Sequence, residues 1–151
     1  MGIDVDKENS SKIKLLSPEE YKNYIPFVHL VDTYFKSSEW EVDKSKLSNE
    51  NQISISVENN ITEINTESVE FVQNYKLRVT PEDQRKVAVK INCEIISACE
   101  SDKELSEKFW ITYAERTLPV VTFPLFREYA FSVSGKMGIK PIIVPLWKRD
   151  Q

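Results

Sequence analysis

The sequence predicts an α+β fold in which an antiparallel sheet precedes a long helix within one domain. Its 151 residues match the usual size of a single domain. Apolar and polar residues alternate over much of residues 69–97, which is the period of half-buried strands. After Ser101 the apolar residues recur at helical spacing instead, so strands come first and helices last.

Composition excludes several classes of function. Glycine occurs three times, so the glycine-rich loops that cradle nucleotide phosphates are excluded. The net charge of −4 and the pI near 5.2 leave no basic surplus to neutralise phosphates, so no nucleic-acid partner is expected. The start of the chain does not resemble a signal peptide, no run of about 18 apolar residues occurs, and there are two cysteines. These features predict a cytoplasmic protein with no membrane partner.

The first 26 residues are predicted to be a polar tail that carries one short helix. Residues 1–16 read as a loose segment without apolar periodicity. Residues 17–20, Ser-Pro-Glu-Glu, combine a capping hydroxyl, a proline at the first helical position and a glutamate three residues after the cap. Pro26 ends this helix.

Residues 27–42 are predicted to form a long strand whose first half is apolar on both faces. Period 2 places Phe27, Val31 and Phe35 on one face, and Val28, Leu30, Tyr34 and Lys36 on the other. A strand of this kind is buried in a core or at a subunit contact. We therefore expect an oligomer.

Three further strands complete the predicted sheet. Residues 53–57 alternate apolar side chains with serine, and residues 58–67 either continue this strand or carry a bend. Two long alternating segments follow, at 69–79 and 87–97, and the turn residues Pro-Glu-Asp at 81–83 join them. Strands joined by a short turn form a hairpin, so the sheet is antiparallel, with one buried face and one polar face.

The last third of the chain is predicted to be helical. Ser101 and Glu104 have the spacing of a capping box, which predicts that a helix begins at Ser101. A longer helix is predicted over about 119–137, where Pro124 lies in the first turn or causes a kink and Gly138 ends the helix. Its apolar stripe is Phe123, Phe126, Ala130, Val133 and Met137. Residues 139–147 are apolar with two prolines and are predicted to lie extended on the body of the protein.

Side chains suited to catalysis are scarce. His29 is the one histidine and lies among apolar neighbours, which favours a structural residue with one hydrogen bond over a base or a metal ligand. Cys93 falls in the buried set of its strand, whereas Cys99 at the strand end is expected to be more exposed. The carboxylates are expected to lie on solvated faces. We therefore predict no enzyme, metal site or cofactor.

Three segments resemble the SecB family of export chaperones and its SecB-like relatives. Residues 34–41, Tyr-Phe-Lys-Ser-Ser-Glu-Trp-Glu, resemble the end of that family's first strand, and residues 69–79 with the next strand resemble its central hairpin. The most specific segment is 118–130, Leu-Pro-Val-Val-Thr-Phe-Pro-Leu-Phe-Arg-Glu-Tyr-Ala, which is similar to the Phe-Pro motif and Ala-Arg-Glu-type run that opens the family's long helix. With the apolar segment after that helix, the resemblance covers residues 27–147.

This resemblance implies a SecB-like domain over residues 27–151, with a four-stranded antiparallel sheet packed on the long helix. It implies a homotetramer built as a dimer of dimers, and an ATP-independent holdase that binds unfolded polypeptides. The client would be a preprotein or, as for relatives encoded beside toxin–antitoxin pairs, an antitoxin. No cofactor is implied.

The resemblance also raises the question of docking on the SecA motor, which export members of the family contact through carboxylates on the sheet. Glu41 matches one such position, and Glu94 is the candidate for another. Ser37 stands where a further carboxylate is usual, and the family's second helix and acidic tail are expected to be missing after Trp147. Both departures argue against SecA docking.

Two sets of apolar residues are candidates for contacts with other chains. The candidates for a peptide-binding groove are Trp40, Ile53, Ile55, Val57, Ile142, Val144, Leu146 and Trp147. The candidates for the oligomer interface are Phe27, Val31, Phe35 and Phe126. For the groove residues, burial in the core or in a subunit contact is the alternative.

Two other functions remain open beside a holdase. One is a non-chaperone oligomeric adaptor that has the same fold and binds one dedicated partner protein. The other is an enzyme acting on a small ligand, for which the sequence offers no nucleophile, metal set or base. Suppression of the aggregation of an unfolded protein at stoichiometric amounts would favour the holdase.

Overall fold

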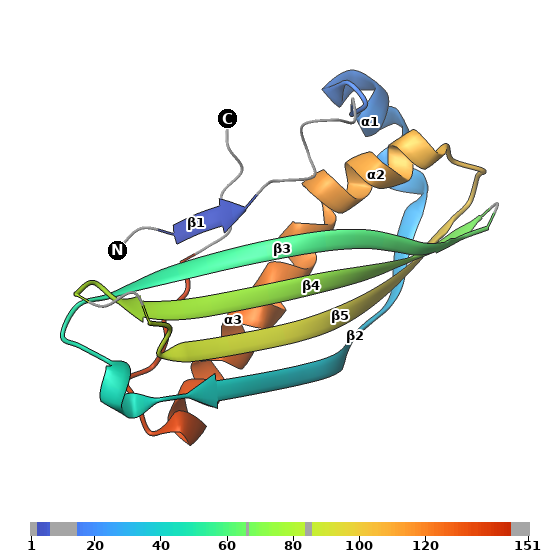
Figure 1. The fold of residues 1–151 in the computed structure, drawn as a ribbon. Helices are drawn as coiled ribbons and strands as arrows, with labels where there is room; N and C mark the ends of the chain where they lie inside the picture. The colour runs from blue at the N-terminus through green and yellow to red at the C-terminus, as the bar shows by residue number, and fades with distance from the viewer. Residues whose placement is uncertain (1–2, 7–14, 66, 84–85, 146–151) are drawn as a thin grey trace.

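The computed structural model describes residues 3–6, 15–65, 67–83 and 86–145 as one sheet covered on one face by helices (Figure 1). The strands are β1 (Ile3–Asp6), β2 (Val28–Val42), β3 (Asn51–Ile64), β4 (Ser68–Pro81) and β5 (Val89–Ser101), in the spatial order β1-β3-β4-β5-β2. The helices are α1 (Pro18–Tyr24), α2 (Glu107–Arg116) and α3 (Leu118–Met137). Strands β2 to β5 are antiparallel neighbours, which confirms the predicted α+β fold with a four-stranded antiparallel sheet and a long helix.

The two central strands, β4 and β5, alternate as the sequence predicts. Odd-numbered residues of both strands point to the helices and are buried, and the register pairs Tyr75 with Cys93 and Leu77 with Ile91. The even-numbered residues are mostly polar and lie on the face that no described helix covers. The predicted hairpin is therefore confirmed. β3 continues to Ile64, with an irregularity in its pairing near Thr62.

The N-terminal segment differs from the loose tail that was expected. Residues 3–6 form β1, which adds to the edge of β3 in parallel (Figure 1). Further along, Leu16 is buried and its backbone N–H donates to Thr112 Oγ1 of α2 at 3.0 Å. The capped start of α1 is confirmed, because Ser17 Oγ accepts a hydrogen bond from the Glu20 N–H.

The long strand predicted over residues 27–42 is confirmed as β2, but its faces are not the ones that strict alternation predicts. The pairing with β5 shifts between Leu30 and Asp32 and again between Phe35 and Ser37. Such bulges insert an extra residue and move the following side chains to the other face. Phe35 consequently shares the helix-facing side with Leu30, and its ring lies 5.4 Å from that of Tyr129 in α3. The predicted common face of Phe27, Val31 and Phe35 is wrong.

The predicted start of α2 at Ser101 is also wrong. Ser101 is the last residue of β5, and its N–H donates to the Glu67 carbonyl at 2.8 Å, which holds it in the sheet. The cap is Ser106, whose Oγ accepts from the Phe109 N–H at 3.1 Å. Sheet pairing therefore outweighed a local capping pattern at Ser101.

Helix α3 follows the predicted course. It contains Pro124, and it ends at Gly138, which adopts the left-handed conformation with φ of 69° that glycine allows. The predicted stripe is buried throughout and packs on β4 and β5 together with the segment after the helix. A second cluster gathers under α1 and α2, around Phe71, Phe109 and Trp110.

Within the described part of the chain, no helix is both long enough and apolar enough to cross a membrane.

Candidate functional site

The segment after α3 is held against that helix by two hydrogen bonds. The Ile142 N–H donates to Ser134 Oγ at 2.9 Å, and Arg127 Nε donates to the Val144 carbonyl oxygen at 2.6 Å. Ile142 and Val144 are buried in the same cluster as Ile53 of β3. Residues 139–145 therefore lie extended on the body of the protein, as predicted, and reach the β3 side of the sheet.

This packing changes the expected peptide-binding groove. Four of its candidate residues are core residues, which is the alternative that the sequence left open: Ile53, Ile55, Ile142 and Val144. Val57 is half-buried at the margin of the same cluster. Leu146 and Trp147 lie outside the described residues. The C-terminal segment itself thus contributes to the core that contains Ile53 and Ile55 of β3.

Other apolar side chains of the same region are exposed. Ile143 lies between the two buried residues of the segment and is 70% exposed. Phe131 and Val120, each 54% exposed, lie on the side of α3 that carries Arg127. Arg127 and Ser134 hold the C-terminal segment at Val144 and Ile142, and Phe131 lies between these two residues on the helix. Ile143, between the two held residues, therefore lies along the same part of the helix. We call Val120, Phe131 and Ile143 the apolar patch, in which Val120 lies about 16 Å from Phe131 along the helix axis.

The sequence did contain a signal for the apolar patch. Val120, Pro124 and Phe131 recur at spacings of four and seven residues, which places them on one side of a helix. That side differs from the one formed by Phe126 and Ala130, which is buried. A helix with apolar residues beyond its core-facing stripe has a second surface available for contacts.

Trp40 is not part of this region. It lies on β2, paired with Ile91, at the opposite side of the sheet from β3. Three strand spacings separate β2 from β3, or about 14 Å. The structure therefore separates Trp40 from the other groove candidates, although its side chain is exposed.

Strand β2 carries an exposed apolar surface of its own. It is the last strand of the sheet, and none of its residues is buried. Its large exposed apolar residues, which we call the β2 edge, are Leu30, Val31, Tyr34, Phe35 and Trp40. Large apolar side chains on both faces of an edge strand are unusual, because such a strand invites pairing with another chain.

The four candidates for the oligomer interface are thus in different environments. Val31 and Phe35 belong to the β2 edge. Phe27 is half-buried, with Lys103 Nζ 4.2 Å from its ring centroid. Phe126 is fully buried under α3 and stacks on Tyr75, so it is unavailable to another subunit and its assignment to the interface is corrected.

The two candidate docking carboxylates lie on the polar face of the sheet, which the helices leave open. Glu41 is exposed on β2 opposite Lys90, and Glu94 of β5 lies between Ser37 and Asn74 in the register. Lys90 and Glu94 are four positions apart on β5, which is about 13 Å along the strand. The structure therefore brings both carboxylates to one face without placing them in contact.

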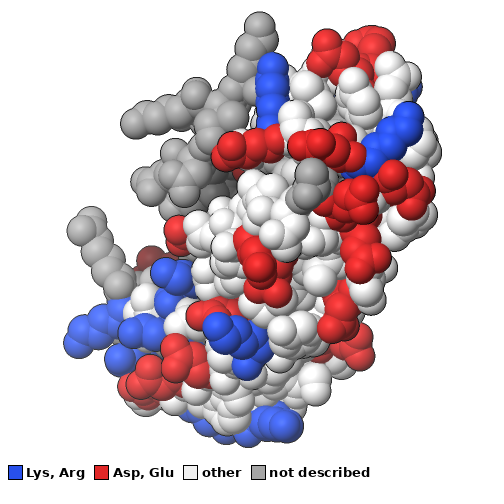
Figure 2. Space-filling model, turned by 90° about the vertical axis from the view of Figure 1, so that its right-hand side faces the viewer, with Lys and Arg blue, Asp and Glu red and all other residues white. Residues whose placement is uncertain are grey.

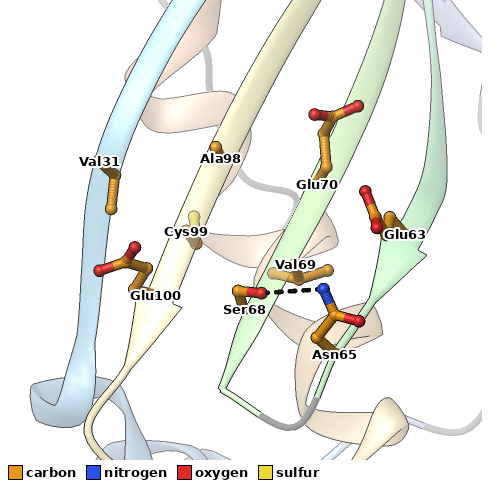
Figure 3. Close-up of a pocket in the computed structure, with 9 residues that line it drawn as sticks. All are labelled: Val31, Glu63, Asn65, Ser68, Val69, Glu70, Ala98, Cys99 and Glu100. Atoms are coloured by element: carbon orange, nitrogen blue, oxygen red, sulfur yellow. Dashed lines mark hydrogen bonds between the residues drawn. The ribbon is translucent and has the colours of Figure 1, made fainter.

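An acidic end of this face was not expected. Glu63, Glu70 and Glu100 come from three adjacent strands and surround a shallow hollow of about 160 Å³ (Figure 3). Thr62 Oγ1 donates to Glu70 Oε1 at 3.2 Å, and Asn65 Nδ2 donates to Ser68 Oγ at 3.3 Å. Acidic side chains dominate the middle and right of Figure 2, whereas basic side chains collect at its lower left. This charge gives the sheet end a preference for neutral or basic segments.

The titratable groups of the core are held in their neutral forms. Burial raises the pKa of the Cys93 thiol to about 12 and also raises the pKa of Cys99, so neither is a reactive thiolate. Cys99 is buried, contrary to the greater exposure expected at a strand end. His29 is exposed, and its Nε2 lies 3.0 Å from Asp102 Oδ2, which is the one hydrogen bond predicted for it.

Comparison with solved structures shows the fold. No family model matches this sequence, and no curated protein is detectably similar to it in sequence. The structure is similar to a SecB-like chaperone of Mycobacterium tuberculosis, solved in complex with a ChAD peptide from the HigA1 antitoxin. Their TM-score is 0.73 at 12% identity, over 87% of this chain and 99% of the other. A protein of unknown function from Streptococcus agalactiae has a TM-score of 0.49 at 8% identity, over 79% of this chain and 97% of the other. The chain thus has a SecB-like fold.

Proposed function

We propose that this protein is an ATP-independent holdase, which binds non-native polypeptide segments and keeps them from aggregating. The observation that carries the proposal is the apolar patch, where Val120, Phe131 and Ile143 are exposed although α3 also buries a full stripe of apolar residues in the core. The antitoxin peptide bound to the SecB-like neighbour supports a polypeptide ligand on this fold. The client would be an antitoxin or a preprotein.

Unfolded chains suit such a surface for a physical reason. They offer apolar side chains, and burial of apolar area contributes about 25 cal/mol per Å² without requiring a defined geometry. Three exposed side chains on a helix and an extended segment form a site that many sequences fit, as a holdase requires. Each contact is weak, so several copies of the site must act together.

We also propose that the β2 edge is the subunit contact that supplies these copies. Two β2 strands pairing across a two-fold axis would continue the sheet from one subunit to the next and cover residues such as Val31 and Tyr34. A second contact would complete a homotetramer. SecA docking through Glu41 and Glu94 is the weaker part of the proposal, because Ser37 occupies the register position beside Glu94.

The test of function is the suppression of aggregation of reduced insulin at stoichiometric amounts. We expect the parent protein to suppress it, and the double variant Phe131→Lys, Ile143→Lys to lose most of this effect, because charge opposes burial of the patch. Ser132→Lys is the matched control, since Ser132 is an exposed residue next to Phe131 on another side of α3. A parent protein that leaves insulin aggregation unchanged would refute the holdase, and a fully active double variant would refute the patch.

The same assay addresses the adaptor alternative. A dedicated adaptor would bind one partner protein and leave insulin and other unfolded proteins to aggregate. Repeating the assay with citrate synthase and with reduced α-lactalbumin therefore distinguishes a general holdase from an adaptor.

A further inference from the structure

Strand β1 is an added strand at the edge of an otherwise antiparallel sheet. Its four residues, Ile3–Asp6, pair in parallel with Ile53–Ser56 of β3. The other described pairings run over 12 or more register pairs, between β2 and β5, β3 and β4, and β4 and β5. Backbone pairing of so short a strand is easily replaced by another extended segment, which is the way that peptides add to exposed sheet edges.

In this pairing, the apolar positions of β1 lie opposite the apolar positions of β3, and the polar positions lie opposite polar ones. Ile3 pairs with Ile53 and Val5 with Ile55, whereas the two aspartates pair with Ser54 and Ser56. β-branched positions therefore stand opposite β-branched positions, and acidic positions opposite small hydroxyl residues. Cross-strand pairs of β-branched residues are favourable in sheets.

The next strand adds a charge preference to this edge. Ser54 pairs with Arg78 and Ser56 pairs with Lys76, so basic residues of β4 follow the two serines across the sheet. Each aspartate position of β1 thus pairs with a serine of β3, and that serine pairs in turn with a basic residue of β4. An extended segment that alternates β-branched with acidic residues has the chemistry that this edge favours.

The β3 edge and the C-terminal segment contribute to one core cluster. Ile53 and Ile55 belong to the same core cluster as Ile142 and Val144, and Ile143 lies between the latter two. A polypeptide bound along β3 would continue onto the segment that carries Ile143. Backbone pairing at β3 and side-chain burial at the patch would then act on one client.

We propose that the edge of β3 at Ile53–Ser56 is a strand-acceptor site, that β1 occupies it as a built-in competitor, and that a client segment alternating β-branched and acidic residues displaces β1. The proposal rests on the function proposed above and adds to it the site, the sequence pattern of the client and an autoinhibitory strand.

The position of β1 in the chain makes it an effective competitor. Nine residues, 7–15, connect Asp6 to Leu16, whose N–H is bound to Thr112. A segment tethered over so short a length meets its site at an effective concentration on the order of millimolar. Clients in solution are far more dilute, so those with weak strand pairing are rejected.

The experiment compares the full chain with a chain that lacks residues 2–8. Two probes are titrated by fluorescence anisotropy: a labelled peptide of residues 2–9, and reduced carboxymethylated α-lactalbumin. We expect the truncated chain to bind the peptide at least about five-fold more tightly than the full chain does, and the α-lactalbumin at least about three-fold more tightly, because the cis competitor is gone. The same peptide with Val5→Pro should not bind, because proline removes an N–H from the paired strand.

Two full-length variants serve as matched controls. Val5→Pro should reproduce the truncation, whereas Asn9→Pro, outside the paired residues, should behave as the parent chain. Equal affinities of the full and truncated chains for both probes would overturn the proposal. Binding of the peptide without binding of α-lactalbumin would uphold the acceptor site and refute the holdase. Binding of α-lactalbumin without binding of the peptide would uphold the holdase and refute the acceptor site.

A measurement on the unmodified protein covers the case in which the truncated chain does not fold. Backbone hydrogen exchange of residues 3–6 should become faster when carboxymethylated α-lactalbumin is added, since displaced amides lose their partners. Slower or unchanged exchange at these residues, with α-lactalbumin bound, would contradict displacement.

Discussion

Tyr75 and Phe126 stack at the centre of the protein, with ring centroids 4.8 Å apart and an interplanar angle of 17°. Tyr75 comes from the central strand β4 and Phe126 from α3, and both are fully buried. The Tyr75 hydroxyl also lies 2.7 Å from Thr122 Oγ1, one turn before Phe126. This pair joins the sheet to the helix that carries part of the apolar patch.

Phe126→Ala should therefore lower the free energy of unfolding by about 3–5 kcal/mol, because it leaves a cavity under α3. Urea unfolding followed by circular dichroism measures this. Phe131→Ala is the matched control, and its exposed side chain predicts a change within about 0.5 kcal/mol. A Phe126→Ala protein of unchanged stability but smaller oligomeric size would restore this residue to the subunit interface.

Arg127→Ala should release the segment that carries Ile143. The variant loses a charge-assisted hydrogen bond to the Val144 carbonyl, which predicts a loss of about 1.5 kcal/mol in stability. Hydrogen exchange at the Ile142 amide should accelerate, because its bond to Ser134 depends on the same docking. Glu128→Ala, at an exposed neighbouring position, should leave this exchange unchanged. Protection that persists in Arg127→Ala would mean that burial alone holds the segment.

Val31→Lys should reduce the size of the oligomer. Val31 is 56% exposed on the β2 edge, and a lysine there places like charges opposite each other when two copies pair. Light scattering at micromolar concentration measures the molar mass, which should fall toward the 17.6 kDa of one chain. Ser132→Lys on α3 adds the same charge away from β2 and should keep the parent mass. An unchanged mass for Val31→Lys would place the subunit contact elsewhere.

Stability should fall as pH rises above about 9. The unfolded Cys93 thiol loses its proton near its ordinary pKa of 9.0, whereas the folded protein keeps it until about pH 12. The stabilisation from this group is therefore complete below pH 9 and is lost as pH rises toward 12, at no more than about 1.4 kcal/mol per pH unit. Denaturant unfolding at pH 8, 9 and 10 gives the slope.

Cys93→Ala should reduce this slope, so its loss of stability relative to the parent protein should be larger at pH 8 than at pH 10. Removal of the thiol eliminates one titrating group, and the small cavity that remains does not depend on pH. Equal slopes for the parent and the variant would show that other groups cause the alkaline loss.

The sequence by itself determined the elements whose burial repeats locally. Period 2 in β4 and β5 identified their buried faces, and helical spacing identified the stripe of α3, because a side chain's direction depends on its own backbone geometry. Gly138 and the Ser17 cap were predictable for the same reason, since each acts within a few residues.

Only the tertiary structure decided which apolar residues remain exposed and which edges are occupied. Ile142, Ile143 and Val144 are alike in sequence, yet the anchors at Ser134 and Arg127 bury the first and third and leave the second exposed. The first bulge in the pairing with β5, between Leu30 and Asp32, decided which way Phe35 points. The addition of β1 to β3 depends on a neighbour some 50 residues away along the chain. A local pattern shows the period of a segment but not which other part of the chain covers it. In this protein, the covering segment determines which residues of the candidate site remain exposed.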